Sequence, residues 1–317
     1  MTGYIIKRIL ATIPVMVIVA LFVFGLLHIT PGDPAAIIAG DYASPADVEA
    51  IREKLGLNEP IHIQFYTWVK SLANGDMGVS VFSNLPVTHL IGQRVEATLM
   101  LSILTIIIAL MASLPLGVLA AWKSRTFIDR FCMIFAVLGF SVPVFVIGYI
   151  LMYVFAIQLK WLPVQGYKYL ADGFWPCIRS LILPSLALGI LYTALIARIT
   201  RASVMEVLAE DYIRTAKAKG ASKRRVILVH ALRNSLFPII TLFASLLPFL
   251  IGGSVIIETI FNIPGMGRFA FEGVLRREYD VVMATLTLSA VLTLGGILVS
   301  DILYVIVNPQ VTFEDGN

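Results

Sequence analysis

The ionisable side chains of this 317-residue chain are concentrated between positions 198 and 233, where cations far outnumber acids. The runs on either side, 180–197 and 234–257, contain no charged residue. A segment of this length is too long for a simple connector. Its chemistry is electrostatic rather than catalytic, which predicts a surface that binds a partner. The cations are Arg198, Arg201, Arg214, Lys217, Lys219, Lys223, Arg224, Arg225 and Arg233, and the acids are Glu206, Glu210 and Asp211.

Motifs for phosphate binding, acyl transfer and metal-dependent hydrolysis do not occur in the sequence. The patterns G-x-x-x-x-G-K-[ST], G-x-S-x-G and H-E-x-x-H are all absent. The two cysteines suggest neither a disulfide framework nor a metal site. We therefore expect no catalytic residue, no metal and no cofactor in this chain. The scattered candidates are His28, His62, His89, His230, Cys132 and Cys177.

Long apolar runs place the chain in the membrane class. Hydrophobic residues make up 58% and charged residues 14% of the chain, whereas a soluble domain carries about 25% charge. Six charge-free runs each reach the roughly 18–20 residues that a helix needs to cross a bilayer. The sequence predicts an all-α membrane protein with six transmembrane helices. The runs are 9–30, 98–121, 131–159, 180–197, 234–257 and 281–300.

The basic residues outside the spans predict the orientation. Short cytoplasmic loops carry an excess of Lys and Arg, and three basic segments fall on one side of the membrane by alternation. Both termini are then cytoplasmic, and the +4 net charge reflects topology rather than nucleic-acid binding. The three segments are Lys7-Arg8, the link holding Lys123, Arg125 and Arg130, and the basic loop 198–233.

This topology divides the chain into four parts. Residues 1–30 form a tail and the first span, and 31–97 form an outer segment. Residues 98–307 hold the other five spans with the loop at about 198–233, and 308–317 form a cytoplasmic tail. The first run is longer than a usual signal-peptide core and lacks an A-x-A-like site, which favours a retained span.

The outer segment carries the signals of two short helices. Ser44 is placed to be the N-cap of a helix, with Pro45 in its first turn and Asp47 as its third residue. Gly56 can end this helix. A second amphipathic stretch follows Pro60 and ends near Gly75. This small helical cap serves either for packing or as a docking surface for an external partner.

The basic loop is predicted to be a helix, a tight turn and a second helix. Residues 204–219 are good helix formers, Gly220 can end the helix, and Ser222 can cap the next one from Lys223. Small side chains at Ala216, Ala218 and Ala221 permit close approach of a partner. The alternatives are a solvated loop or one that binds anionic lipid heads.

Prolines and glycines within the runs favour bent, closely packed helices. Pro143, following Ser141, is the strongest candidate for a functional bend beside a pathway. Glu258 and Asp301 lie near the ends of the last two spans, and we expect both to be solvated at an interface.

The segment from Tyr212 to Ser222 resembles the cytoplasmic loop motif of binding-protein-dependent ABC importer permeases, E-A-A, three residues, then Gly. Here Arg214-Thr215-Ala216 replaces E-A-A, and Gly220 stands at the expected offset. That variant is similar to the dipeptide, oligopeptide and nickel branch. Further agreeing stretches are Tyr4-Ile-Ile-Lys-Arg, Pro31-Gly-Asp-Pro34, His230-Ala-Leu-Arg-Asn, and Glu258 to Arg268.

The resemblance implies a mechanism and a set of partners. A second permease would complete the pathway, two ABC ATPases holding ATP and Mg would bind beneath, and an extracytoplasmic solute-binding protein would dock outside. The energy for import would come from those ATPases. The implied coupling residues are Tyr212, Arg214, Thr215, Ala216, Lys219, Gly220, Ala221 and Ser222. The implied candidate pathway or gate residues are Ser141, Pro143, Pro264, Gly265 and Gly267.

The resemblance leaves the substrate open. Short peptides are favoured, with nickel, glutathione or opine-like solutes as rivals, in the cytoplasmic membrane of a bacterium or archaeon. A self-sufficient secondary transporter is the remote alternative, but neither inverted repeats nor paired intramembrane charges are found. The family often has R-D-Y-P before the last span, whereas this chain has Arg277-Glu278-Tyr279-Asp280. The lost proline puts the outer-gate geometry in question.

Overall fold

The computed structural model describes residues 2–29, 33–40, 43–252 and 254–307. Helices dominate these residues, and the strand-like pairing found among them is an isolated antiparallel bridge between Val79 and Pro86. The chain divides into two compact units, which are treated separately. Unit 1 comprises Met1–Thr98 and Pro264–Gly295, and unit 2 comprises Leu99–Ile263 and Gly296–Asn317.

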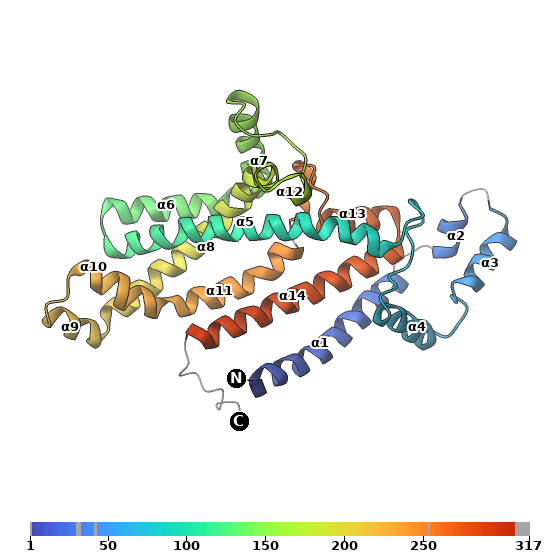
Figure 1. Cartoon of the computed structure of the whole chain (residues 1–317), viewed down its shortest axis with the longest axis horizontal. Coiled ribbons are helices and arrows are strands. Elements are labelled where there is room, and N and C mark those ends of the chain that lie inside the picture. The colour runs from blue at the N-terminus through green and yellow to red at the C-terminus, as the bar shows by residue number, and fades with distance from the viewer. Residues whose placement is uncertain (1, 30–32, 41–42, 253, 308–317) are drawn as a thin grey trace. The chain divides into compact units, whose positions relative to one another are not determined.

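Unit 1 contains the first helices, the outer segment, the helix before the last one and the first part of the last helix (Figure 1). Helices α5 and α14 contribute residues to both units. The helices that begin in unit 1 are α1 (Thr2–Ile29), α2 (Pro34–Ala39), α3 (Pro45–Lys54), α4 (Ile61–Ala73), α5 (Val87–Trp122), α13 (Met266–Arg276) and α14 (Tyr279–Val307).

The two helices predicted in the outer segment are confirmed as α3 and α4. The Ser44 hydroxyl accepts the backbone N–H of Asp47, and the Asp47 carboxylate accepts the hydroxyl and N–H of Ser44. These bonds hold the pKa of Asp47 below its ordinary value. Gly56 and Gly75 have φ of +66° and +78°, the left-handed conformation that ends a helix without steric penalty.

Aromatic packing attaches α4 to α1. The ring of Phe24 lies 5.3 Å from that of Phe65 and 5.8 Å from that of Trp68. His28 packs on Phe24 as well, with ring centroids 4.2 Å apart, and its Nδ1 lies 2.9 Å from the Phe24 carbonyl oxygen. His28 therefore packs within this aromatic cluster.

The corner between α13 and α14 is held by two acidic side chains. Arg277 adopts φ of +55°, and the N–H of Glu278 then reaches the carbonyl of Gly273 at 2.9 Å. The buried Glu278 carboxylate accepts the Ser80 hydroxyl at 2.5 Å. The Asp280 carboxylate accepts the backbone N–H of Val79. The acid at this position therefore gives the corner a hydrogen bond to the chain before α5.

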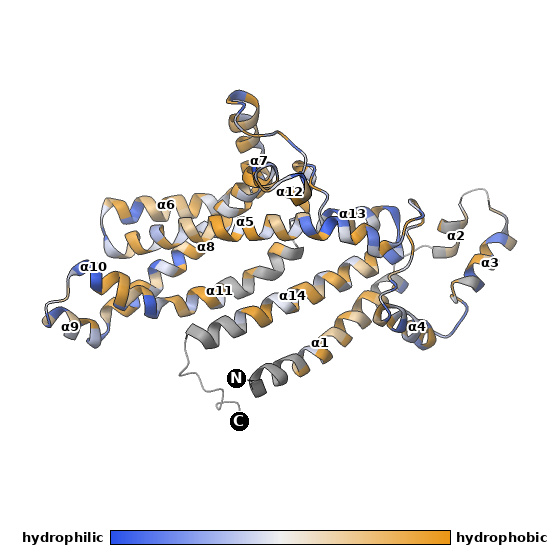
Figure 2. Ribbon diagram, in the orientation of Figure 1, coloured by the Kyte–Doolittle hydropathy of each residue, from blue (hydrophilic) through white to orange (hydrophobic). Residues whose placement is uncertain are grey.

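Unit 2 is organised around α8 (Phe174–Ala209), against which α6, α7 and α11 pack (Figure 1). Figure 2 shows apolar colour along α5, α6 and α8 and hydrophilic colour at α9 and α10. The other helices are α6 (Phe127–Ser141), α7 (Val144–Leu151), η1 (Met152–Gln158), η2 (Leu170–Asp172), α9 (Asp211–Ala218), α10 (Lys223–Arg225), η3 (Val226–Ala231), α11 (Leu232–Gly252) and α12 (Val255–Ile260).

Small residues at every fourth position allow α5 and α8 to approach closely. In a bilayer, lipid competes with apolar side chains, so close packing of small residues holds helices together. An added Cβ at Gly117 would lie 2.7 Å from the Ala197 carbonyl oxygen, and one at Gly189 would lie 2.9 Å from Ile108. The buried ridges are Thr105, Ala109, Ser113 and Gly117 on α5, and Ser185, Gly189, Thr193 and Ala197 on α8.

The third apolar run is one of two that the structure interrupts. Helices α6 and α7–η1 meet at an angle of 102° across the break at residues 142–143. Pro143 is the N-cap of α7, and it has no N–H to continue the ladder from α6. The predicted bend at this proline is confirmed.

The predicted count of six spanning helices is not confirmed by the part of the chain that the structure describes. Among the described residues, four helices are long and apolar enough to cross a bilayer, or five if the bent pair is one span. The described apolar part of α1, Leu10–Gly25, is shorter. The candidates are Val87–Trp122, Phe174–Ala209, Lys223–Leu242 and Tyr279–Ser300, with the pair Phe127–Ser141 and Val144–Gln158.

The expected solvation of Glu258 is wrong. The fifth run is divided into α11 and α12, and Glu258 on α12 is fully buried. The Ser254 hydroxyl, four residues earlier on the same helical face, donates to its carboxylate at 2.7 Å. The side chain of Asp301 lies outside the described part of the chain. So do residues 31–32, the first half of the stretch Pro31-Gly-Asp-Pro34.

We predict that Gly117→Ala destabilises the protein whereas Gly92→Ala does not. A methyl group at Gly117 meets the backbone of α8, and such overpacking costs about 1–3 kcal/mol. Gly92 lies on the same helix with open space around it, where alanine gains up to about 1 kcal/mol. Thermal unfolding in detergent gives the two Tm values. Equal Tm values for both variants would contradict the close α5–α8 contact.

Candidate coupling site

The connection between α8 and α11, which holds the candidate coupling residues, begins where α8 ends. Glu210 has an extended backbone, with ψ of 148°, and separates α8 from α9. The single helix expected over 204–219 is therefore two helices. The break lets α9 take its own direction, which is fixed by one apolar residue: Ile213 is completely buried, whereas Tyr212, Arg214 and Thr215 are exposed.

Hydrogen bonds fix the start of α9. The Asn234 amide at the beginning of α11 donates to the Tyr212 hydroxyl at 2.6 Å. Thr215 donates its hydroxyl to the Asp211 carbonyl at 3.1 Å, and Arg214 lies 3.3 Å from the Asp211 carboxylate. The last pair is so exposed that it contributes little to stability. The Tyr212–Asn234 hydrogen bond and the buried Ile213 side chain hold α9 in place, and the charged groups remain available at the surface.

Gly220 ends α9 in a Schellman motif, as predicted. Its φ is +84°, its N–H donates to the Lys217 carbonyl at 3.0 Å, and the N–H of Ala221 donates to the Ala216 carbonyl at 3.1 Å. Lys219, the preceding cap residue, is exposed. A Cβ at Gly220 would have no atom within 4 Å. The turn is thus open to the surroundings, and glycine is required there by conformation.

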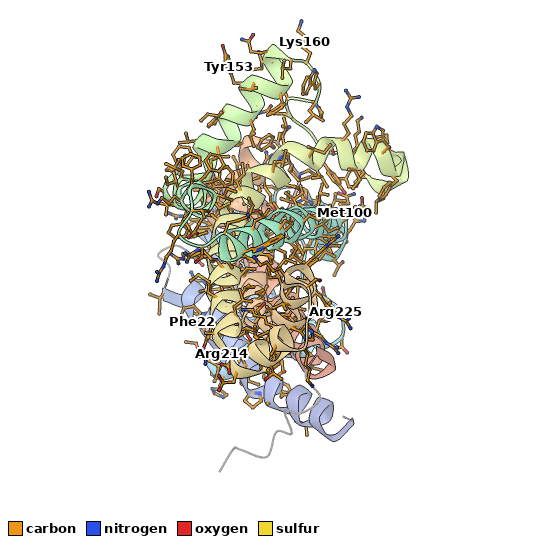
Figure 3. The ribbon with its side chains drawn as sticks, turned by 90° about the vertical axis from the view of Figure 1, so that its left-hand side faces the viewer. Phe22, Met100, Tyr153, Lys160, Arg214 and Arg225 are labelled. Carbon is orange, nitrogen blue, oxygen red and sulfur yellow. The ribbon has the colours of Figure 1, made fainter. Side chains whose placement is uncertain are left out.

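Ser222 begins the second helix of the loop. Its hydroxyl accepts the N–H of Arg225 at 3.4 Å, which confirms the predicted cap. From Lys223 the chain stays helical through α10, η3 and α11. Figure 3 views this end of the molecule and labels Arg214 and Arg225 on either side of the turn. The exposed cations of the two helices are Arg214, Lys217, Lys219, Lys223, Arg224 and Arg225.

A small apolar core supports the loop from within unit 2. It joins the end of α5, the end of α8 and η3, with Met205, Val207, Leu208 and Leu232 packed around it. This core connects the exposed loop to two of the long helices. Its members are Val118, Ala121, Val204, Ile227 and Ala231.

A partly buried ion pair between α6 and α8 was not anticipated from the sequence. Arg201 on α8 donates from Nε and Nη2 to the two carboxylate oxygens of Asp129, at 2.6 and 2.8 Å. Asp129 lies in the first turn of α6 and also accepts the N–H of Arg125 at 2.9 Å. The partners are 72 positions apart. The only sequence signal is an isolated acid among the cations of the 123–130 link.

The candidate pathway residues fall into two groups. Ser141 and Pro143 lie at the α6–α7 break in unit 2, where the Ser141 hydroxyl donates to the Val137 carbonyl at 2.8 Å. Pro264, Gly265 and Gly267 precede or begin α13 in unit 1, where Gly265 is the N-cap. The candidate coupling residues, in contrast, all lie within α9 and the turn that leads to α10.

Residues 113–313 match the family described as binding-protein-dependent transport system inner membrane component, and residues 1–102 match its N-terminal counterpart. A solved structure of an amino acid ABC transporter shares the fold, with a TM-score of 0.50 and 19% identity over 68% of this chain and 94% of that chain.

Curated relatives match over nearly their whole length. A probable peptide ABC transporter permease protein of Sinorhizobium fredii is 47% identical, covering 98% of this chain and 99% of that protein. A glutathione transport system permease protein of Escherichia coli strain K12 is 41% identical, covering 99% and 100%. The same-named protein of Salmonella paratyphi A is 40% identical with the same coverage. The chain therefore belongs to the binding-protein-dependent inner membrane component family and is a membrane permease subunit of an ABC importer.

Proposed function

We propose that this permease carries short peptides. The observation that supports this is the 47% identity, over 98% of the chain, to a relative named as a probable peptide permease. The relatives named as glutathione permeases fit the same chemical class, because glutathione is itself a tripeptide with one γ-linked bond. Glutathione is accordingly the second candidate, ahead of nickel and opine-like solutes.

We further propose that the surface from Tyr212 to Ser222 is the coupling site for an ABC ATPase. Its exposed helix, open turn and rim of cations suit an acidic-rimmed groove on a partner. The apolar core beneath the loop supports transmission, because it joins the loop to α5 and α8. The ATPases hold ATP and Mg, and their closure moves α9.

The proposed complex contains this chain, a second permease, two ABC ATPases and an extracytoplasmic solute-binding protein. The chain crosses the bilayer six times with both termini in the cytoplasm. Helix α1 and the α6–α7–η1 pair are then spans, in addition to the four single helices. The segment 31–97 faces outward, where the binding protein docks.

The two groups of candidate pathway residues are proposed to act as hinge and gate. The break at Ser141–Pro143 provides a bend that neighbouring helices can change, because Pro143 leaves the backbone ladder interrupted. Pro264, Gly265 and Gly267 give α13 a start with little side-chain bulk. In each case a small or cyclic residue stands where the chain changes direction.

We predict that Gly220→Arg prevents the ATPase from binding while the permease still inserts. The new side chain projects from the open turn, and the left-handed conformation costs a non-glycine residue roughly 1–2 kcal/mol. Co-purification of the ATPase and peptide uptake should both be lost. Gly75→Arg is the matched control for ATPase co-purification alone, since Gly75 also ends a helix at positive φ in open space but lies in the segment where the binding protein is proposed to dock. Normal ATPase binding by Gly220→Arg would refute the site.

We predict that Ser222→Cys reacts with a membrane-impermeant maleimide only from the cytoplasmic side. Trp175→Cys should react only from outside. Trp175 is 65% exposed and lies at the start of α8, which the proposed topology places on the outer side. Cys132 and Cys177 are buried, so the parent protein is the unlabelled control. Labelling of position 222 from outside would reverse the topology.

We predict that proteoliposomes holding the complete complex take up a dipeptide or tripeptide in an ATP-dependent manner. Binding protein and peptide are added outside and ATP inside. Glutathione and Ni²⁺ are tested in parallel, and exclusive uptake of either would replace the peptide assignment. The permease alone is the control, because accumulation without ATPases would indicate a secondary transporter.

A further inference from the structure

The Asp129–Arg201 ion pair lies outside the segment from Tyr212 to Ser222 to which ATPase binding is assigned. The Asp129 side chain is 7% exposed and that of Arg201 is 26% exposed. Both carboxylate oxygens of Asp129 accept hydrogen bonds from two guanidinium nitrogens of Arg201. This two-point geometry fixes direction as well as distance between α6 and α8.

Stability alone is a weak explanation for such a pair. Removing two charges from water is costly, and well-packed apolar residues in place of a buried pair are often neutral or stabilising. The pair does, however, join α8, which leads to α9, with α6, which leads to the bend at Ser141–Pro143. Arg201 lies near the end of α8, which α9 follows after the break at Glu210, and Asp129 lies in the first turn of α6, the helix that ends at Ser141.

A second contact joins the same two helices nearer the bend. A Cβ added at Gly139 on α6 would lie 3.2 Å from Ile190 and 3.3 Å from Ala194 on α8. Helix α6 is thus attached to α8 near both of its ends, by an ion pair at one and by close packing at the other. A rigid helix attached at two points moves with its neighbour.

We propose that Asp129 and Arg201 are positioning residues that make α6 move with α8, so that displacement of α9 reaches the Ser141–Pro143 break. This rests on the proposed coupling role of α9. ATPase closure moves α9, which contacts both η3 and α8. The apolar core joins η3 to the end of α8, and the ion pair passes the movement on to α6. The bend at Ser141–Pro143 then changes with each cycle.

The decisive variant is the double substitution Asp129→Asn with Arg201→Met. Asparagine keeps an oxygen to accept the Arg125 N–H, and methionine fills the volume of the arginine stem, so no charge is left buried alone. Folding yield and Tm should remain near the parent values. In proteoliposomes with ATPases and binding protein, peptides imported per ATP hydrolysed should fall about fivefold or more, within the usual range of coupling between sites.

Two comparisons make this result specific. Arg201→Lys keeps the charge and loses the two-point bond, so the number of peptides it imports per ATP should lie between those of the parent and the double variant. It replaces the double variant as the test if the double variant folds poorly. Glu272→Gln removes a 2.7 Å ion pair within α13, which joins no two helices, and its ratio should equal that of the parent. A folded double variant, or Arg201→Lys, with the parental ratio would overturn the proposal.

The outcome is separable from that for the coupling site. If α9 does not couple, Gly220→Arg retains the ATPase and normal uptake, whatever the ion pair does. If α9 couples but the ion pair does not transmit, Gly220→Arg fails while the double variant imports normally. Loss of ATPase co-purification by the double variant would also overturn the proposal, because the pair is assigned no part in binding.

Discussion

The close contact of α5 and α8 is the constraint on which unit 2 depends. Thr105, Ala109, Ser113 and Gly117 leave room for the α8 backbone, and the approach is so close that a single methyl group at Gly117 would meet a carbonyl oxygen. Lipid supplies no hydrophobic force between helices, so this contact depends on shape. Because α8 is fixed in this way along its buried length, its end can support a loop made of polar residues.

The surface from Tyr212 to Ser222 shows how few residues hold an exposed element in place. Ile213 supplies the buried contact, the Tyr212–Asn234 hydrogen bond fixes the start of α9, and Gly220 with Ser222 sets the turn. The cations contribute little to this local fold and are free to serve recognition. Separating structural from recognition residues allows the surface to change its charge pattern without losing its form.

Local features of the fold could be predicted from the sequence. The caps at Ser44 and Ser222 and the stops at Gly56, Gly75 and Gly220 depend on residues within one or two turns, and each has the predicted geometry. Features that depend on distant residues could not be predicted. The α8–α9 break, the burial of Glu258 and the Asp129–Arg201 pair each depend on which helices pack together, and sequence separation hides that.

The acidic corner between α13 and α14 has a practical consequence for exchanging parts between relatives. Ser80 and Val79 bind Glu278 and Asp280, and Gly78 leaves only 2.5 Å between an added Cβ and the Asp280 carboxylate. The outer segment and residues 277–280 therefore have to be exchanged together, although nearly two hundred positions separate them. A chimera that takes the outer segment from a relative with proline at position 280 must take that relative's corner too.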